Sequence, residues 1–206
     1  NNMHYITEIK DIGKKCRIII DDDIVVQLYK GEVRKLGIKA DSQFSNESYN
    51  EMYNILNKRA RERSLFLLKD MDKTEKQIRD KLKLGDYPED IINNAIEFLK
   101  KYGYVDDIRY AKLYISSKQN SKSIKQIELE LYKKGVNKEN VSKVLLEMDL
   151  SNEEALNKLI EKIIKKYDLN DKTQYNKMCR YLLGKGFSYG EIQEALFKYT
   201  NYDTEW

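Results

Sequence analysis

Residues 127–145, IELELYKKGVNKENVSKVL, decide the fold of this chain of 206 residues. Measured from Ile127, apolar residues stand at offsets +4, +9, +14, +17 and +18. Ile127 and Leu131 have helical spacing, and so do Val141, Val144 and Leu145, because residues three or four apart share one side of a helix. Gly135 lies between them, where a left-handed residue typically ends a helix. The stretch therefore predicts two helices joined by a tight turn, each burying one apolar stripe.

The same apolar template occurs twice more in the chain. It starts at Ile78 in residues 78–96, IRDKLKLGDYPEDIINNAI, and at Met178 in residues 178–196, MCRYLLGKGFSYGEIQEAL. All eighteen template positions are apolar or aromatic, and the copies start about fifty residues apart. A preceding helix completes each unit. The sequence thus predicts a mainly α fold of three tandem three-helix repeats forming a curved, elongated body, which suits an extended partner.

Helix-boundary residues support this division independently of the apolar pattern. The single proline, Pro88, stands where the first turn of a helix accepts it. Two capping pairs mark the starts of other helices, and two glycines, which readily adopt a left-handed conformation, mark helix ends. These residues are Thr74 with Gln77, Ser123 with Gln126, Gly135 and Gly186.

The first 43 residues have a different pattern. The short β-branched runs ITEIKDI, CRIIID and IVVQLYK, separated by the turn signals GKK and DDD, predict a small N-terminal antiparallel β subdomain. Residues 21–23 are interpreted as a turn, because three adjacent aspartates cannot all converge on one metal ion. From Ser48 onward the spacing is helical. The predicted domains are 1–43, the β subdomain, and the repeats 44–105, 106–149 and 150–206.

Asp106 and Asp107 pose a choice between an acidic catalytic pair and a helix start. They lie in GYVDDIRYAKLYI, residues 103–115, just before helically spaced apolar residues. A carboxylate at this point accepts hydrogen bonds from unpaired backbone N–H groups and faces the positive end of the helix. We interpret the pair as structural.

Signals of catalysis, metal binding and membrane insertion are weak. No apolar run approaches the ~20 residues of a membrane span, and the polar start NNMHYITEIK lacks the apolar core of a signal peptide. Cys16 and Cys179 match no metal or redox spacing and are expected to be buried thiols. His4, the only histidine, is expected in a disordered start, and the Gly184–Gly186 stretch is too short for a phosphate loop. We expect a cytoplasmic monomer without enzymatic activity, cofactor or metal.

Three segments, residues 63–115, 124–136 and 181–196, resemble the RecX family, the regulators of the recombinase RecA. The first segment is the most specific. The β-rich leader and the following long helix are similar to the amino-terminal extension of Gram-positive members. One residue departs from the family pattern: Asp86 takes the place where the family usually has glycine. The resemblance implies a non-enzymatic protein that binds the RecA filament on single-stranded DNA and restrains ATP hydrolysis and strand exchange.

The excess positive charge is concentrated in one part of the chain. Residues 58–83 carry 10 basic and 5 acidic side chains, whereas residues 1–57 have a net charge of −1 and residues 84–206 are neutral. We predict that this region forms a basic surface that binds either DNA phosphates or acidic recombinase residues. The candidate binding residues are Lys58, Arg59, Arg61, Arg63, Lys76, Arg79 and Lys83.

Two alternatives remain at this point. A three-helix unit with a tight turn can dock on duplex DNA as a helix-turn-helix regulator. Against this, the second helices of the other two repeats are not enriched in basic residues. A purely structural scaffold would show no salt-sensitive association with a nucleoprotein filament.

Overall fold

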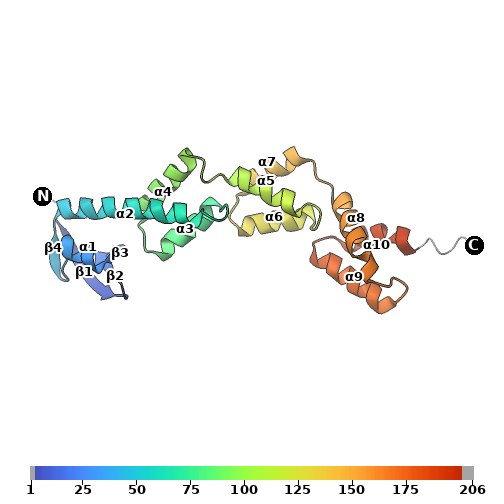
Figure 1. Cartoon of the computed structure of the whole chain (residues 1–206), viewed down its shortest axis with the longest axis horizontal. Helices are drawn as coiled ribbons and strands as arrows, with labels where there is room; N and C mark the ends of the chain where they lie inside the picture. The colour runs from blue at the N-terminus through green and yellow to red at the C-terminus, as the bar shows by residue number, and fades with distance from the viewer. Residues whose placement is uncertain (1–2, 201–206) are drawn as a thin grey trace, which may run out of the picture. The chain divides into compact units, whose positions relative to one another are not determined.

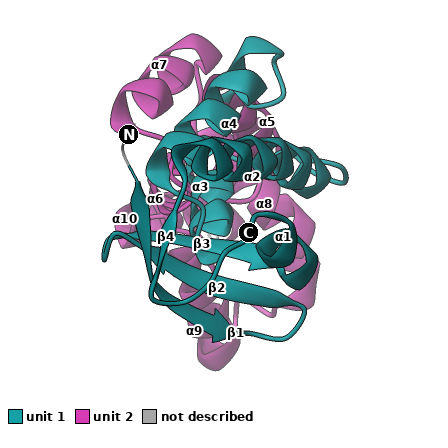
Figure 2. Cartoon of the chain, turned by 90° about the vertical axis from the view of Figure 1, so that its left-hand side faces the viewer, with its two compact units in different colours: residues 1–106 teal, residues 107–206 magenta. Residues whose placement is uncertain are grey.

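A computed structural model describes residues 3–200 of the chain (Figure 1). The chain divides into two compact units, residues 1–106 and 107–206 (Figure 2). The elements of the first unit are β1 (His4–Asp11), β2 (Lys15–Ile20), β3 (Ile24–Tyr29), α1 (Lys30–Lys35), β4 (Ser42–Phe44), α2 (Asn46–Leu67), α3 (Glu75–Leu84) and α4 (Glu89–Lys101). Those of the second are α5 (Asp107–Lys118), α6 (Ile124–Lys133), α7 (Lys138–Met148), α8 (Asn152–Ile163), the 3₁₀ helix η1 (Ile164–Lys166), α9 (Lys172–Gly184) and α10 (Tyr189–Thr200).

The four strands form one antiparallel sheet in the order β3-β2-β1-β4. Alternate residues of β2, namely Cys16, Ile18 and Ile20, are buried, as the two-residue period of a strand requires. Asp21 and Asp22 turn the chain into β3 with positive φ angles of 54° and 62°, which Asp tolerates better than most residues. The turn interpretation of residues 21–23 is confirmed. The sequence prediction missed α1 and β4, whose six and three residues are too short for a periodic signal.

The sheet and the first repeat share one hydrophobic core. Ile18 and Leu28 of the sheet belong to the same cluster of buried side chains as Leu56 of α2, Ile78 of α3 and Leu99 of α4. In Figure 1 the sheet lies along the N-terminal part of α2, and α3 and α4 pack on its remainder. Burial of apolar surface therefore fixes the sheet against the three helices, which positions the side chains between them.

The apolar template corresponds to the cores of the three repeats. Of its eighteen positions, fifteen are buried, and the other three, Tyr87, Leu145 and Ala195, are half-buried. The second repeat (α5–α7) and the third (α8–α10) each have their own hydrophobic cluster. The predicted fold class, three-helix repeats after a β-rich start, is confirmed.

Pro88 is the N-cap residue of α4, one position before the first turn in which the sequence analysis placed it. Of the two predicted capping boxes, one forms completely and the other in part. Thr74 and Gln77 form a reciprocal capping box at α3. At α6, Ser123 accepts from the Gln126 backbone, but the Gln126 side chain donates to Glu130 instead. The Ser123 N–H donates to the Lys185 carbonyl at 3.0 Å, so a contact with the third repeat replaces half of the box.

Three further expectations can be compared with the structure. The expectation that His4 lies in a disordered start is wrong: it opens β1, stacks on Tyr49 with ring centroids 3.8 Å apart, and contacts Asp21. Cys16 and Cys179 are buried and unpaired, as expected. Among residues 3–200, no helix has both the length and the apolarity needed to cross a bilayer.

Candidate functional site

The four predicted cations of α2 do not share one face. Successive helical residues are rotated by about 100°, so Arg59 and Arg63, four residues apart, share one side of α2, whereas Lys58 and Arg61 point elsewhere. The Arg61 guanidinium lies 4.9 Å from the centroid of the Phe98 ring on α4. Lys58 is exposed and lies 4.0 Å from Glu62. These positions separate Lys58 and Arg61 from the other two arginines.

Arg59 is directed towards the sheet. Its guanidinium forms an ion pair with Glu32, donates to the Gln27 carbonyl at 3.3 Å, and lies 4.8 Å from the centroid of the Tyr29 ring. Its side chain is only 17% exposed. Arg59 thus connects α2 to β3 and α1, and its guanidinium also lies close to the Tyr29 ring.

The predicted cations of α3 also differ in their surroundings. Arg79 donates to Glu75 at 3.0 Å, to Glu89 at 3.3 Å and to Asn93 at 2.8 Å, so it links α3 to α4. Burial favours the neutral form of Glu75, but hydrogen bonds from Lys100 and Arg79 outweigh it and lower the pKa of Glu75. Arg79 is therefore a structural residue as well as a cation.

The remaining two α3 cations are more accessible. Lys76 pairs with Asp80 one turn away at 2.6 Å, and both side chains are more than half exposed. Such exposed pairs contribute little to stability and leave the ammonium group available to a partner. Lys83 is exposed near the end of α3.

A basic cleft of about 570 Å³ lies between the sheet, α2 and α3. It combines four cations with aromatic and apolar side chains from three parts of the first unit. We call it the β–α cleft; its lining residues are Lys15, Tyr29, Arg59, Glu62, Arg63, Lys81, Leu84, Gly85 and Tyr87. Of the predicted binding residues, the structure brings together only Arg59 and Arg63 here.

Three cations of the β–α cleft lack a carboxylate partner. Within residues 3–200, Lys15, Arg63 and Lys81 form no ion pair, whereas Arg59 is neutralised by Glu32. Lys15 instead lies 5.0 Å from the centroid of the Tyr29 ring, and Arg63 lies 5.6 Å from that of Phe66. Uncompensated positive charge in a concave surface focuses the electrostatic field and attracts anions.

The turn after α3 forms one side of the β–α cleft. Asp86 has a left-handed φ of 54°, and its carboxylate accepts from Arg17 at 3.1 Å and Gln27 at 2.8 Å. A Cβ on Gly85 would lie 2.9 Å from the Tyr87 ring, so the turn and this ring are closely packed. Burial raises the pKa of Tyr87 despite the nearby Arg59. The Asp86 bonds hold this turn against β2 and β3.

Lys15, Tyr29, Lys81 and Leu84 are not among the binding residues predicted from the sequence. Lys15 belongs to the GKK turn signal, and Lys81 lies in the basic region but outside the predicted set of binding cations. Leu84 lies off the apolar stripe of α3 and is 77% exposed, but single exposed leucines are common, so its sequence position does not mark it as a binding residue.

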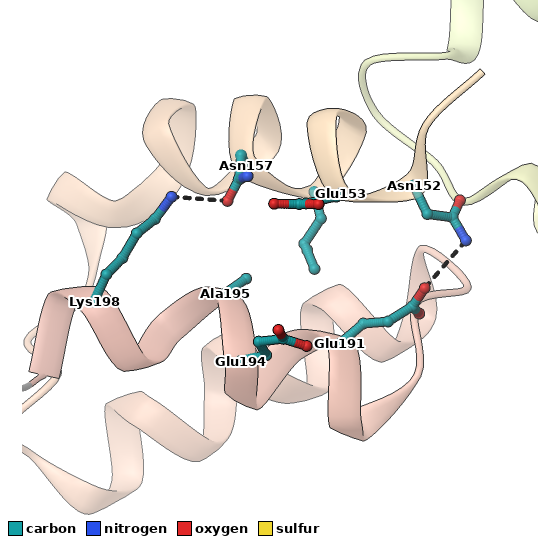
Figure 3. Close-up of a pocket in the computed structure, with 8 residues that line it drawn as sticks. Asn152, Glu153, Asn157, Glu191, Glu194, Ala195 and Lys198 are labelled. Atoms are coloured by element: carbon teal, nitrogen blue, oxygen red, sulfur yellow. Dashed lines mark hydrogen bonds between the residues drawn. The ribbon is translucent and has the colours of Figure 1, made fainter. Parts of the chain in front are cut away.

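A second cleft, in the third repeat, is acidic. It has a volume of about 210 Å³ and lies between α8 and α10, as Figure 3 shows. Lys198 donates to Asn157 at 3.0 Å and Asn152 donates to Glu191 at 3.2 Å, so polar contacts bridge the two helices. These contacts give it a role in packing, and we do not assign it as the binding site.

The acidic residues singled out in the sequence lie where a helix begins. Asp106 immediately precedes α5, and Asp107 is its first residue. In the part of the chain that the structure describes, no group of three or more His, Cys, Asp or Glu side chains has the arrangement of a metal site.

Comparison with known proteins places these repeats in one family. Three RecX family models match in order: the first three-helix domain over residues 60–99, the second over 106–145 and the third over 151–196. Two proteins named regulatory protein RecX are similar to this chain. The one from Clostridium beijerinckii (strain ATCC 51743 / NCIMB 8052) is 34% identical, over 68% of this chain and 67% of the relative.

The second relative, from Clostridium botulinum (strain Eklund 17B / Type B), is 30% identical over 92% of each chain. A crystal structure of regulatory protein RecX covers 93% of this chain and 99% of its own, with a TM-score of 0.57 and 21% identity, and it shows the same fold. The match thus includes the N-terminal sheet as well as the repeats. The chain belongs to the RecX family.

Proposed function

We propose that this protein is a non-enzymatic modulator of the RecA recombinase, acting as an inhibitor that binds the RecA filament on single-stranded DNA. In this proposal it restrains ATP hydrolysis and strand exchange, and it acts as a monomer in the cytoplasm. The observation that carries the proposal is the presence of all three RecX repeats in order in one chain. The relatives' name, regulatory protein, agrees with a role that acts on another protein.

The first repeat and its sheet are the proposed contact region. They contain residues 58–83, where positive charge is concentrated, and we propose that the filament contacts come from among Lys58, Arg59, Arg61, Arg63, Lys76, Arg79 and Lys83. Because Arg79 and Arg59 are engaged in internal ion pairs, their replacement would also disturb packing. We propose that the segments 1–43, 44–105, 106–149 and 150–206 act together, with the repeats following the filament as an extended partner.

Purified components test this function. We expect the protein to reduce RecA-driven ATP hydrolysis and strand exchange in a dose-dependent way, while hydrolysing no nucleotide by itself. Unchanged recombinase activity at saturating protein would contradict the proposal. Binding to bare single strands, to duplex and to RecA-coated single strands is measured in parallel. Tight binding to one defined duplex, with no preference for the filament, would instead favour a helix-turn-helix regulator.

A further inference from the structure

We infer that the β–α cleft binds a nucleotide segment of single-stranded DNA, with phosphates on Lys15, Arg63 and Lys81 and a base against Tyr29. The inference names the ligand of the proposed contact region and rests on the proposed function for its biological setting. It moves the expected contact from the face that carries Lys76 and Arg79 to the concave surface between the sheet and α3.

The charges of the β–α cleft suit phosphodiester groups. The three cations without ion-pair partners come from β2, α2 and α3, so they surround the cleft from three sides. Among the described residues that line it, Glu62 is the only one with a carboxylate, and it lies 4.0 Å from Lys58. Cations of this kind bind nucleic acids by neutralising phosphates and releasing counterions, without reading the base sequence.

The β–α cleft also has aromatic and apolar lining residues, Tyr29 and Leu84, which a phosphate group alone would leave uncovered. Tyr29 is 43% exposed at the end of β3, and Lys15 and Arg59 lie 5.0 and 4.8 Å from its ring centroid. Leu84, the last residue of α3, also lines the cleft and exposes 77% of its surface. An aromatic ring beside cations is the pattern by which proteins hold unpaired bases, because every base has a face that can stack.

An unpaired strand fits these features better than an acidic peptide or a duplex. Carboxylates of a peptide would pair with the cations but would leave Tyr29 and Leu84 without a matching surface. The bases of a duplex are stacked on each other and are not presented to an aromatic side chain. The volume of about 570 Å³ lies within the range of roughly 300–1,000 Å³ found for small-molecule sites, so the cleft has room for a nucleotide unit.

The frame of the β–α cleft is fixed before a ligand arrives. Arg59 is held by Glu32 and the Gln27 carbonyl, and Asp86 is held by Arg17 and Gln27. These bonds join the sheet to α2 and to the turn after α3. A preformed site loses less conformational freedom on binding than a mobile one.

The test compares two double variants with the same charge change, each on two neighbouring helices of one repeat. The cleft variant is Arg63→Gln with Lys81→Gln; the control variant is Lys125→Gln with Lys143→Gln, on α6 and α7 of the second repeat. All four side chains are exposed. Fluorescence anisotropy with a labelled oligothymidylate measures affinity across a salt series, and circular dichroism checks folding.

We expect the cleft variant to lose at least about fivefold in affinity for the single strand, and the control variant to lose less than about twofold. Each phosphate contact contributes about 0.7 to the slope of log affinity against log salt for single strands, so the cleft variant should lower this slope by about 1.4. Tyr29→Leu should weaken oligothymidylate binding about fivefold but leave binding of an abasic strand of equal length unchanged.

Other ligands identify the chemistry that the β–α cleft recognises. Free thymidine triphosphate, duplex and polyglutamate are used as competitors of the labelled strand. Polyglutamate that competes as well as the single strand would overturn the inference in favour of an acidic peptide. Equal losses in the two double variants, or no binding of the wild-type protein to the free strand, would overturn it as well. Inhibition of the recombinase that persists in these cases would leave the proposed function standing.

Discussion

Asp86 occupies the position that Gly135 and Gly186 occupy in the other two repeats, eight residues after the start of the apolar template. All three have positive φ, of 54°, 94° and 93°, as the left-handed end of a helix requires. A non-glycine residue in this region costs roughly 1 kcal/mol or more. Here the Asp86 side chain forms two hydrogen bonds to the sheet that glycine cannot make. The departure from the family pattern thus coincides with the attachment of the sheet to the first repeat.

Glu130 permits a prediction of how stability depends on pH. It accepts from Lys122 and Tyr114, each at 2.5 Å, and from Gln126 at 3.2 Å. Burial raises its pKa, but these hydrogen bonds outweigh burial and lower the pKa of Glu130 to about 2, from an ordinary 4.5. Because the folded-state pKa is depressed, the stabilisation is complete above the unfolded-state pKa and is lost as pH falls from about 4.5 through about 2.

We therefore expect Glu130→Gln to lower the free energy of unfolding at pH 7 by about 1–2 kcal/mol, since charged hydrogen bonds in partly solvated surroundings have this size. Urea denaturation should show the difference from wild type shrinking as the pH falls below about 4.5. The control Glu128→Gln lies on the same helix and has one partner, Tyr132, so its loss should be smaller. A difference that stays constant down to pH 2 would contradict this assignment.

At the scale of elements, the second and third repeats meet at Gly186. Its φ is +93°, and a Cβ there would lie 2.4 Å from the Ser123 Oγ and 2.7 Å from the Gln126 Cβ. The Ser123 N–H donates to the neighbouring Lys185 carbonyl, and Asn152 accepts from the Ile124 N–H at 2.8 Å and donates to Glu191. The helix cap of α6 is thus also the contact surface of the third repeat.

Gly186→Ala should consequently destabilise the second unit by about 2 kcal/mol or more, because it combines backbone strain with a steric clash. Gly184→Ala is the matched control. It changes the last residue of α9, where an added Cβ meets nothing within 4 Å, and alanine favours a helix by up to about 1 kcal/mol. Chemical denaturation of both variants checks the opposite signs. Equal stability of the two variants would show that the second repeat adjusts to the added Cβ with no loss of unfolding free energy.

The sequence predicted elements better than it predicted the candidate site, for a physical reason. Periodicity is a local property, so the spacing of Ile127 and Leu131 predicts a buried helix face without information from the rest of the chain. The β–α cleft depends on contacts between distant residues, such as Arg17 with Asp86, which are 69 positions apart. No local pattern encodes that Lys15 and Lys81 face the same cleft. The basic count correctly marked the region but not the direction of each side chain.

For the whole molecule, the distribution of the core predicts how the chain unfolds. One cluster of buried side chains joins the sheet to the first repeat, and two others lie in the second unit. The two compact units meet between Asp106 and Asp107 in the sequence. Residues in one cluster lose their contacts together, so the sheet and helices α2–α4 should unfold as one cooperative group.

Three core substitutions, followed by differential scanning calorimetry, test this cooperativity. Ile18→Ala in β2 and Leu99→Ala in α4 each remove a fully buried side chain from the shared cluster, at a cost of about 2–5 kcal/mol. Both should shift the same unfolding transition to lower temperature and leave the other in place. Ile127→Ala in α6, also fully buried, should shift only the transition of the second unit. The contrary result is an additional transition at lower temperature in Ile18→Ala that is absent from Leu99→Ala. It would mean that the sheet unfolds alone and that the bonds of Arg59 and Asp86 do not couple it to the helices.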